Sequence, residues 1–122
     1  MKEIYIIDDD ESILKLINMT LLKNIKDVFI MTEKNGRRGF RLIKSGHADL
    51  IILDINLPGM NGVNICRELR KIQKYKKTPI LAFTALDMNG GQEYILNAGF
   101  DFCIPKTAEL SYIVKIIKKY LK

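Results

Sequence analysis

The stretch Ile4–Ser12, IYIIDDDES, runs from four apolar residues directly into four consecutive acids, Asp8 to Glu11. Adjacent carboxylates raise one another's pKa and so disfavour joint ionisation. A soluble turn needs no more than Asn, Ser or Gly at such positions. The acids therefore either begin a solvated helix or face a cation, and the stretch alone favours neither explanation.

The whole chain has the composition of one soluble globular domain, expected to span residues 1–122. It is 48% hydrophobic and 28% charged, and no apolar run is long enough to cross a membrane. The N-terminus meets acids too early for a secretory signal, so we expect a cytoplasmic protein. Cys66 and Cys103 lack metal-binding spacing and are expected to be reduced and buried. For the formal charge of +6, solvated basic helix faces are favoured over a nucleic-acid or acidic partner.

Four further apolar runs resemble Ile4–Ile7 in length and composition. None alternates polar and apolar residues, so strands formed there would be covered on both faces, as in a parallel sheet. Segments with helical spacing lie between the runs, and the chain is therefore predicted to be an open, doubly wound α/β sandwich of strand and helix units. The five predicted strands are 4–7, 28–31, 50–53, 80–83 and 102–104.

The predicted helices differ in strength. Helices are expected around 40–43 and over 63–72, the latter with Asn61 as its N-cap. The segment 92–98 is a shorter, weaker helix, which we expect to be entered through Gly90 and Gly91 and closed by Gly99. Two helices show a clear apolar face. The residues on these faces are Ile13, Leu16, Ile17, Thr20 and Leu21 in the first helix, and Leu110, Ile113, Val114, Ile117 and Leu121 in the last.

Polar residues follow four of the five predicted strands. Doubly wound folds place their sites beyond the carboxyl ends of the strands, where the strand order reverses. The second strand ends without an obvious candidate, and the others are followed by Asp8 and Asp9, Asp54, Thr84, and Lys106. If the first and third strands are neighbours, the three aspartates converge. An all-oxygen site open to water suits Mg²⁺ rather than zinc.

These residue types suit phosphoryl transfer. Asp54 directly ends a buried run and precedes a Pro-Gly turn, so it could act as a nucleophile and form an acyl phosphate. Mg²⁺ would neutralise the carboxylate and the phosphoryl oxygens. Lys106 would pair with one phosphoryl oxygen, and Thr84 would donate a hydrogen bond to another.

The chain resembles the response-regulator receiver domains of bacterial two-component signalling. The resemblance covers nearly the whole chain and is carried by four motifs in the family's order and spacing: IYIIDDDES, DLIILDINLPGMNG, PILAFTALDM and AGFDFCIPK. It implies a flavodoxin-like fold with the strand order 2-1-3-4-5. It also implies that Asp54 is the phospho-acceptor, that Asp9 binds Mg²⁺ directly, and that Asp8 acts mainly through water.

The same resemblance implies roles for other residues and for partners. Asn56 would give Mg²⁺ its backbone carbonyl, Thr84 and Lys106 would be the switch hydroxyl and the site lysine, and Leu86 and Asn56 would tune the lifetime of the acyl phosphate. The phosphoryl group would come from a sensor histidine kinase or a histidine phosphotransfer protein. Phosphorylation would change the face built from 92–98, 102–104 and 110–121, which would signal to a downstream protein, an output domain or a second copy in a homodimer. Such a domain is a signalling switch that catalyses only its own phosphoryl transfer and dephosphorylation.

Two positions depart from the family pattern. The last strand usually carries Tyr or Phe as a rotamer switch, but here that position is Cys103, and Phe102 is expected to face the other side of the sheet. Family members often place a proline after the lysine, in a cis peptide. Here Pro105 comes before Lys106, and we expect the Ile104–Pro105 bond to be trans.

Two other classes of protein use similar features. Haloacid-dehalogenase-like phosphatases combine an Asp nucleophile with Mg²⁺, Ser or Thr, and Lys, but they need a second Asp two residues after the nucleophile, where this chain has Asn56. A cap domain is also absent from these residues. A flavodoxin would need a phosphate-binding loop after the first strand, where the acids of DDDES would repel the FMN phosphate. The phosphatase is therefore the alternative hypothesis and the receiver the main one.

Several charged or polar residues are expected to have structural or solvent-exposed roles. Asp10, Glu11 and Ser12 should begin a helix, where acids are favoured by the helix dipole. His47 should lie on the surface. The basic stretch 69–77, LRKIQKYKK, and the pair Arg37 and Arg38 are expected to be solvated helix faces. The four acids after the first strand are thus predicted to be unequal in function.

Overall fold

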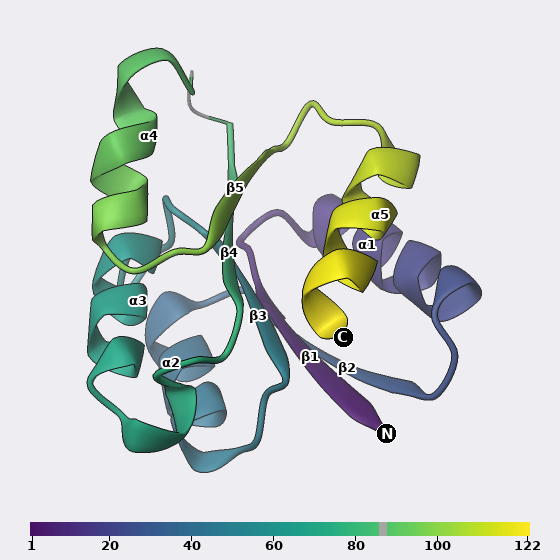
Figure 1. The fold of residues 1–122 in the computed structure, drawn as a ribbon, viewed down its shortest axis with the longest axis horizontal. Coiled ribbons are helices and arrows are strands. Elements are labelled where there is room, and N and C mark those ends of the chain that lie inside the picture. Colours follow the sequence, from purple (N-terminus) through teal and green to yellow (C-terminus); the bar gives the residue numbers. More distant parts are fainter. Residues whose placement is uncertain (86–87) are drawn as a thin grey trace.

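A computed structural model describes residues 1–85 and 88–122 of the chain, and for 88–92 it describes the backbone only (Figure 1). One sheet lies between two layers of helices. Its strands are β1 (Lys2–Ile7), β2 (Val28–Glu33), β3 (Leu50–Asp54), β4 (Ile80–Thr84) and β5 (Phe102–Pro105). The helices are α1 (Glu11–Asn24), α2 (Gly36–Ser45), α3 (Gly62–Arg70), α4 (Met88–Asn97) and α5 (Leu110–Leu121), with a 3₁₀ turn, η1 (Gln73–Tyr75), after α3.

The sheet has the strand order that the family resemblance implies. The strands lie in the order β2-β1-β3-β4-β5, and every neighbouring pair is parallel. Ile4 of β1 lies opposite Ile30 of β2 on one side and Leu50 of β3 on the other. The strand order therefore reverses at β1 and β3, whose carboxyl ends meet at one edge of the sheet.

Each face of the sheet has its own core, because successive side chains of a strand point to opposite faces. Helices α2, α3 and α4 cover one face, and α1 and α5 cover the other (Figure 1). In β3, Ile51 and Leu53 belong to the first core and Leu50 and Ile52 to the second. The apolar runs in β1, β3 and β4 are thus buried on both faces, as predicted, whereas the expectation was wrong for β2 at the edge of the sheet, where Phe29 is 48% exposed.

The buried face of α1 differs from the predicted one. The helix buries Leu14, Ile17 and Leu21, whereas Leu16 is 49% exposed and Thr20 is only partly buried. Met19 is also exposed, which shows that α1 carries apolar residues on more of its circumference than the sheet and α5 cover. Two apolar stripes with helical spacing were therefore available, and packing selected the one through Leu14.

Two helix boundaries also differ from expectation. Helix α4 begins at Met88, so Gly90 and Gly91 lie within it and do not precede it, although each glycine weakens a helix by about 1 kcal/mol relative to alanine. Helix α3 ends at Arg70 and not at 72, because the chain tightens into η1. Gly99 closes α4 as predicted, in a left-handed conformation with φ of 112° that favours glycine.

Short polar side chains cap the helices that lead away from the site. Asp10 caps α1: its Oδ1 accepts hydrogen bonds from the backbone N–H groups of Ser12 (3.0 Å) and Ile13 (3.2 Å). Asn61 caps α3 by accepting from the N–H of Asn64 at 2.9 Å. Both predictions are confirmed, and the third acid of DDDES therefore has a structural role.

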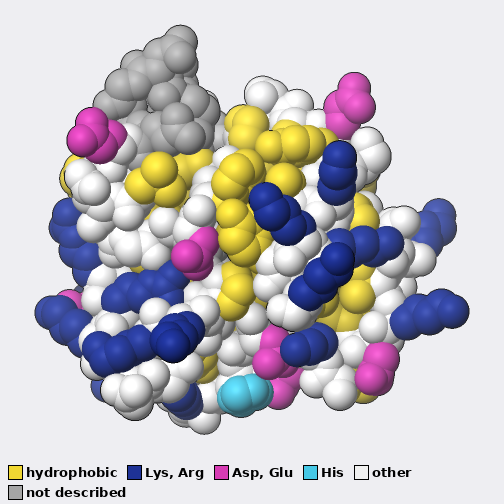
Figure 2. Space-filling model, viewed as in Figure 1, with side chains coloured by type: hydrophobic (Ala, Val, Ile, Leu, Met, Phe, Trp, Pro, Cys, Tyr) yellow, Lys and Arg dark blue, Asp and Glu magenta, His cyan; other side chains and the backbone are white. Residues whose placement is uncertain are grey.

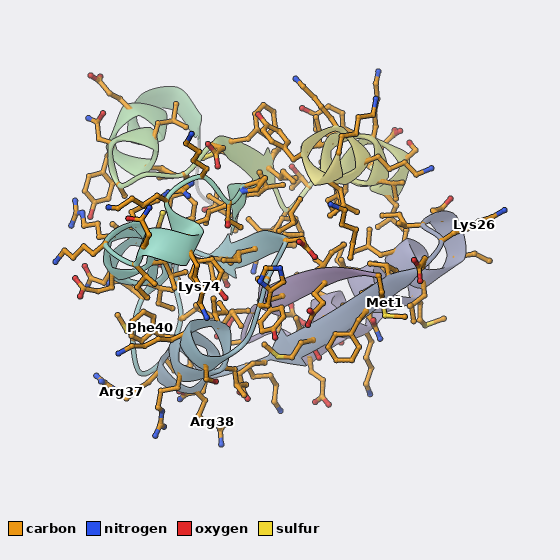
Figure 3. All side chains as sticks on the ribbon, turned by 60° about the horizontal axis from the view of Figure 1, so that its bottom comes forward. Met1, Lys26, Arg37, Arg38, Phe40 and Lys74 are labelled. Carbon is orange, nitrogen blue, oxygen red and sulfur yellow. The ribbon has the colours of Figure 1, made fainter. Side chains whose placement is uncertain are left out.

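The predicted surface residues are mostly solvent-exposed. Arg37 and Arg38 project outward from α2 (Figure 3). His47 is also exposed, with its Nε2 3.5 Å from Oδ1 of Asp49. None of the helices in the described part of the chain is both long and apolar enough to cross a bilayer.

Arg70 is an exception within the basic stretch 69–77. Its side chain is only 19% exposed, and the guanidinium donates to the carbonyls of Gly99 (2.9 Å) and Thr78 (2.7 Å) and to Oδ2 of Asp101 (2.9 Å). A guanidinium has five donors in a rigid plane and so can satisfy several carbonyls at once. Arg70 therefore links the end of α3 to the segments on either side of β4, and the expectation that it is solvated was wrong.

The two cysteines are free and buried, as predicted. Burial raises the pKa of the Cys66 thiol to about 12 and also raises the pKa of Cys103. Both thiols therefore stay protonated near neutral pH and pack as small apolar side chains.

Candidate functional site

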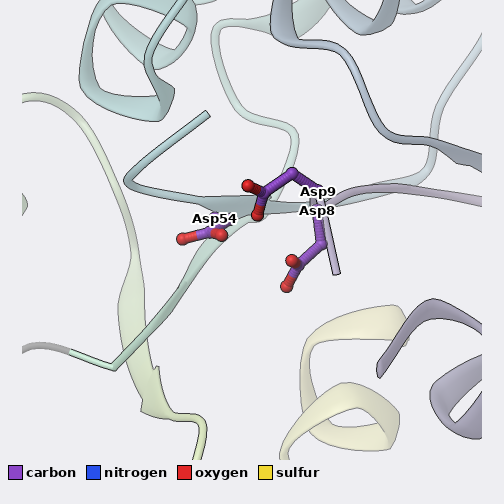
Figure 4. A group of neighbouring side chains, drawn as sticks. All are labelled: Asp8, Asp9 and Asp54. Atoms are coloured by element: carbon purple, nitrogen blue, oxygen red, sulfur yellow. The ribbon is translucent and has the colours of Figure 1, made fainter. Parts of the chain in front are cut away.

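The three aspartates singled out in the sequence lie together at the carboxyl edge of the sheet. Asp8 and Asp9 directly follow β1, and Asp54 is the last residue of β3. One carboxylate oxygen from each lies within 4.8 Å of the others (Figure 4). Asp8 and Asp54 are buried and Asp9 is exposed. The convergence expected from adjacent first and third strands is thus what the structure shows.

Lys106, which directly follows β5, inserts its ammonium group between two of these carboxylates. Its Nζ lies 2.9 Å from Oδ2 of Asp8 and 2.9 Å from Oδ2 of Asp54. Burial by itself would lower the pKa of Lys106, but the hydrogen bonds to Asp54 and Asp8, together with their negative charges, outweigh burial and raise that pKa. The lysine is therefore charged at neutral pH and compensates part of the acidic cluster.

Asp8 is buried more completely than its hydrogen bonds compensate. Its Oδ1 accepts hydrogen bonds from the N–H of Asp10 at 2.9 Å and from the Lys106 ammonium at 3.1 Å, whereas the only contact of Oδ2 with a donor in the described part of the chain is the ion pair with that same ammonium. Burial raises the pKa of Asp8, against the opposing effects of the Asp10 N–H and the Lys106 ammonium. A buried carboxylate oxygen that shares one ammonium group with other acceptors is suited to a bound cation or to the water of a hydrated one.

The charges of the site match a divalent cation. Asp8, Asp9 and Asp54, when ionised, together with Lys106 leave two negative charges in a cluster of carboxylate oxygens. Oxygen ligands that are partly open to water suit Mg²⁺, which keeps several of its water molecules. The residues present therefore fit the metal that the sequence suggested.

Asp54 is held by backbone contacts from its own loop. The N–H of Asn56 donates to Oδ1 of Asp54 at 3.1 Å, and the N–H of Gly62 donates to the carbonyl of Ile55 at 2.9 Å. A Cβ atom at Gly62 would lie only 2.1 Å from the carbonyl oxygen of Asp54. Gly62 thus allows the start of α3 to pack directly against the backbone of Asp54, a role that the sequence analysis did not identify.

The neighbouring edge of the sheet also positions the site. The N–H of Asp8 donates to the carbonyl of Glu33 at the end of β2, at 3.0 Å. The N–H of Gly36 donates to the carbonyl of Pro58 at 2.9 Å, and a Cβ at Gly36 would lie 1.9 Å from the carbonyl oxygen of Met60. The second strand, which ends without a candidate side chain, therefore contributes through its backbone. The PGMNG turn was the available signal that the loop after Asp54 needs close backbone packing.

Thr84 and the residues of β5 occupy the remaining expected places. Thr84 is buried at the end of β4, and its carbonyl accepts from the N–H of Lys106 at 2.8 Å. Cys103 belongs to the core under α2, α3 and α4, whereas Phe102 faces α5, as predicted. The Ile104–Pro105 peptide is trans. Leu86 lies outside the described residues.

A comparison with protein families identifies this arrangement. The family model of the response regulator receiver domain matches residues 4–118. The chain belongs to this family. As a receiver domain, it is part of the signalling-switch family of two-component systems, whose members interact with histidine kinases.

Relatives of this receiver domain include proteins of different length. It is 28% identical over 123 aligned residues to the polar-differentiation response regulator DivK of Brucella ovis, with 98% of this chain and 96% of that one covered. It is 32% identical to the aerobic respiration control sensor protein ArcB of Escherichia coli, over 93% of this chain but only 16% of ArcB. The family thus includes both a protein of similar length and a segment of a much longer sensor.

Solved structures of receiver domains share the fold. The beryllofluoride-activated receiver domain of RstA from Klebsiella pneumoniae is 30% identical, with a TM-score of 0.89 and 99% of both chains covered. The receiver domain of a sensor histidine kinase from Pseudomonas aeruginosa PAO1 is 23% identical, with a TM-score of 0.87 and coverage of 98% and 97%. That second structure holds a magnesium ion in its active-site cleft.

Proposed function

We propose that this receiver domain accepts a phosphoryl group on Asp54 from a sensor histidine kinase or a histidine phosphotransfer protein, in a reaction that depends on Mg²⁺. The observation that carries the proposal is the position of the Asp54 carboxylate. It is buried at the end of β3, beside two further aspartates and 2.9 Å from the Lys106 ammonium. A carboxylate in such a place can be both a nucleophile and a metal ligand.

The metal would be held by this chain's own oxygen atoms. Asp9 and Asp54 would bind Mg²⁺ through their carboxylates, Asn56 through its backbone carbonyl, and Asp8 through water. When bound, Mg²⁺ would offset the negative charge of the phosphoryl oxygens and of the attacking carboxylate. The exposure of Asp9 and the burial of Asp8 support this division, because a hydrated cation reaches Asp9 from solvent.

In the transfer itself, an oxygen of Asp54 forms a bond to phosphorus while the bond from phosphorus to the donor's imidazole nitrogen breaks. The Lys106 ammonium already lies against the Asp54 carboxylate, and it would pair with a phosphoryl oxygen once the negative charge has moved there. The Thr84 hydroxyl would donate a hydrogen bond to another phosphoryl oxygen. Hydrolysis of the acyl phosphate would return the free Asp54.

Phosphorylation would shift a two-state equilibrium of the surface formed by α4, β5 and α5. This surface would signal to a downstream protein, to an output domain or, in a homodimer, to a second copy. Thr84 ends β4, and the segment between β4 and α4 would follow its hydroxyl, although residues 86–87 of that segment lie outside the described part. The two free, buried cysteines suit a reducing compartment, which supports the expectation of a cytoplasmic protein.

The test is intact-mass spectrometry of the protein after incubation with Mg²⁺ and acetyl phosphate. We expect the wild type to gain one phosphoryl group and Asp54→Asn to gain none. The matched control is Asp27→Asn, at an exposed aspartate in the turn between α1 and β2, and it should be phosphorylated normally. An excess of EDTA should prevent the reaction. A wild type without an adduct, or an undiminished adduct on Asp54→Asn, would contradict the proposal.

A further inference from the structure

The exposed side of α5 carries a concentration of positive charge. The segment from Leu110 to Lys122 contains four lysines and no acid. All four lysine side chains are exposed, and together with Tyr112 and Ile116 they line an open hollow along the helix. The lysines are Lys115, Lys118, Lys119 and Lys122. Because Tyr112, Lys115 and Lys119 are spaced by three and four residues, they lie on one face of the helix.

These four lysines lack the ion pairs that some other lysines of the chain form. Lys15 and Lys34 both lie near Glu11, and Lys71 lies 2.8 Å from Glu68. Among the described residues, no carboxylate lies within ion-pair distance of the four lysines of α5. Like charges three and four residues apart repel one another, so this arrangement disfavours the free helix.

The helix dipole explains only part of this charge. Lys118 and Lys119 lie in the last turn of α5, where positive charge is favoured by the negative end of the dipole. Lys115 lies outside that turn, and the dipole does not explain why Tyr112 is 42% exposed beside it. A binding role accounts for both residues.

An apolar strip lies next to the lysines. Phe102 of β5 and Tyr120 of α5 are half-buried, with their ring centroids 6.0 Å apart. Figure 2 shows hydrophobic side chains gathered in a strip through the middle of this face, bordered on the right by Lys and Arg side chains. An apolar centre beside a charged rim is the usual composition of a protein interface, in which tyrosine is enriched.

We propose that this surface, the α5 lysine face, binds an acidic amphipathic segment of a partner protein. Carboxylates of the segment would pair with Lys115, Lys119 and Lys122, and its apolar side chains would contact Tyr112 and Ile116. The inference rests on the proposed function in one respect, namely that β5 and α5 belong to the signalling face. It adds the chemistry of the partner to that face.

The structure favours a protein segment over a membrane or a nucleic acid. Ile116 is only 8% exposed and Phe102 is half-buried, which leaves Tyr112, 42% exposed, as the main side chain that could enter a bilayer, far less than the apolar face of a membrane-binding helix. The charges on α5 are all lysines, which lack the planar fork with which arginine recognises bases and phosphates in two places at once. A carboxylate needs no more than an ammonium group at ion-pair distance.

The test measures binding of a short fluorescein-labelled peptide that carries glutamates and leucines at helical spacing, by fluorescence anisotropy. The variant Lys115→Glu/Lys119→Glu reverses two charges of the proposed site. The matched control, Lys23→Glu/Lys26→Glu, reverses two exposed charges at the end of α1 and just beyond it, where Lys26 extends into solvent (Figure 3). Both pairs of substitutions lower the formal net charge of +6 by four units.

We expect the α5 variant to bind the peptide about tenfold more weakly than the wild type, because two attractive pairs become repulsive, and the α1 control to retain most of its affinity. Tyr112→Ser should also weaken binding without any change in charge. A peptide with glutamine in place of glutamate should bind weakly to every form. Thermal unfolding of each variant shows that the fold is intact.

Three results would overturn the proposal. Equal losses in the α5 and α1 variants would mean that only net charge matters, and equal binding of the glutamine peptide would mean that charge is not recognised. The third result is that the wild type does not bind the peptide but sediments with phosphatidylserine vesicles, whereas the α5 variant does not sediment with them. This result would assign the face to a membrane. Phosphorylation by acetyl phosphate is measured separately on the same variants, so a failure at Asp54 is distinguished from a failure on α5.

Discussion

Lys106 joins two buried carboxylates through one ammonium group, although the three residues lie at the ends of different strands. Its Nζ is 2.9 Å from both Asp8 and Asp54, and its side chain is only 15% exposed. Removing one partner of a buried ion pair leaves the other charge uncompensated, which is far more damaging than removing an exposed pair. The stability of the site therefore depends on Lys106, which is also the residue proposed to pair with the phosphoryl group.

Replacement of Lys106 by methionine keeps the long side chain and removes the charge. We expect the free energy of unfolding to fall by about 3–5 kcal/mol in the absence of Mg²⁺, as for other broken buried pairs. Lys71→Met is the matched control, because its pair with Glu68 is exposed, and it should cost less than about 1 kcal/mol. Urea unfolding followed by circular dichroism measures both values. Similar losses in the two variants would mean that the buried pair contributes little.

The roles of the acids after β1 were predictable to different degrees. The apolar run Ile4–Ile7 identified the strand, and the strand identified Asp8 as the first residue at the edge of the sheet. The capping role of Asp10 followed from its position before a helical segment. The incomplete compensation of the Asp8 carboxylate was not predictable, because it depends on how one ammonium group, that of Lys106, is shared between Asp8 and Asp54 across a separation of nearly a hundred residues in sequence.

At the scale of elements, the loop that carries Asp54 is fixed by two close backbone approaches. Gly62 packs against the carbonyl of Asp54, and Gly36 packs against the carbonyl of Met60. Neither glycine was identified from the sequence, because a close approach between two segments is visible only when both are placed. The strands were predictable since their residues are continuous and apolar, whereas the buried stripe of α1 was not, since more than one stripe of that helix is apolar.

Gly62→Ala should therefore displace Asp54 as well as destabilise the protein. A Cβ there would lie 2.1 Å from the carbonyl oxygen of Asp54, and we expect a loss of about 1–3 kcal/mol, as in other overpacked positions. The rate of phosphorylation by acetyl phosphate should fall. The control is Gly46→Ala, at a residue just beyond the end of α2 that lies away from the site. A Cβ there would lie 2.3 Å from the Tyr5 hydroxyl. That variant should lose stability but keep the rate. A normal rate in Gly62→Ala would show that the contact does not position the acceptor.

At the scale of the whole molecule, the fold has an acidic edge in a chain of net charge +6. The family resemblance supplied the strand order, and the strand order brought the acids together. The boundary of α4 was wrong because glycine weakens a helix without necessarily ending it, so Gly90 and Gly91 did not mark its start. The excess of Lys and Arg over Asp and Glu could be counted from the sequence. That four exposed lysines lie together along α5 could be seen only once the helix was placed.

Mg²⁺ should stabilise the folded protein, and the gain should depend on pH. At about a hundredfold excess over Kd, a ligand that binds only the folded state adds about 2.7 kcal/mol. Burial raises the pKa of Asp8, so Asp8 favours the fold when protonated, and this contribution is lost as the pH rises through the folded-state pKa. Protons therefore compete with Mg²⁺ for the Asp8 carboxylate up to a higher pH than they would for an aspartate with an ordinary pKa.

Thermal unfolding with and without Mg²⁺ over a range of pH measures this effect. The increase in Tm should be largest near neutral pH and should shrink on acidification. Asp9→Asn should show a much smaller increase at every pH, because it removes the exposed carboxylate that a hydrated cation reaches. An increase that is independent of pH and unchanged in Asp9→Asn would place the bound cation elsewhere.

Strand β5 is only four residues long, so its two ends lie about 10 Å apart. One end leads to Lys106 among the acids, and the other carries Phe102 against Tyr120 of α5. β5 is also an edge strand, paired with β4 alone among the strands of the sheet described here. Beside the route through Thr84, a displacement of Lys106 would therefore have a direct covalent path of one short strand to the Phe102–Tyr120 contact on the surface of α5.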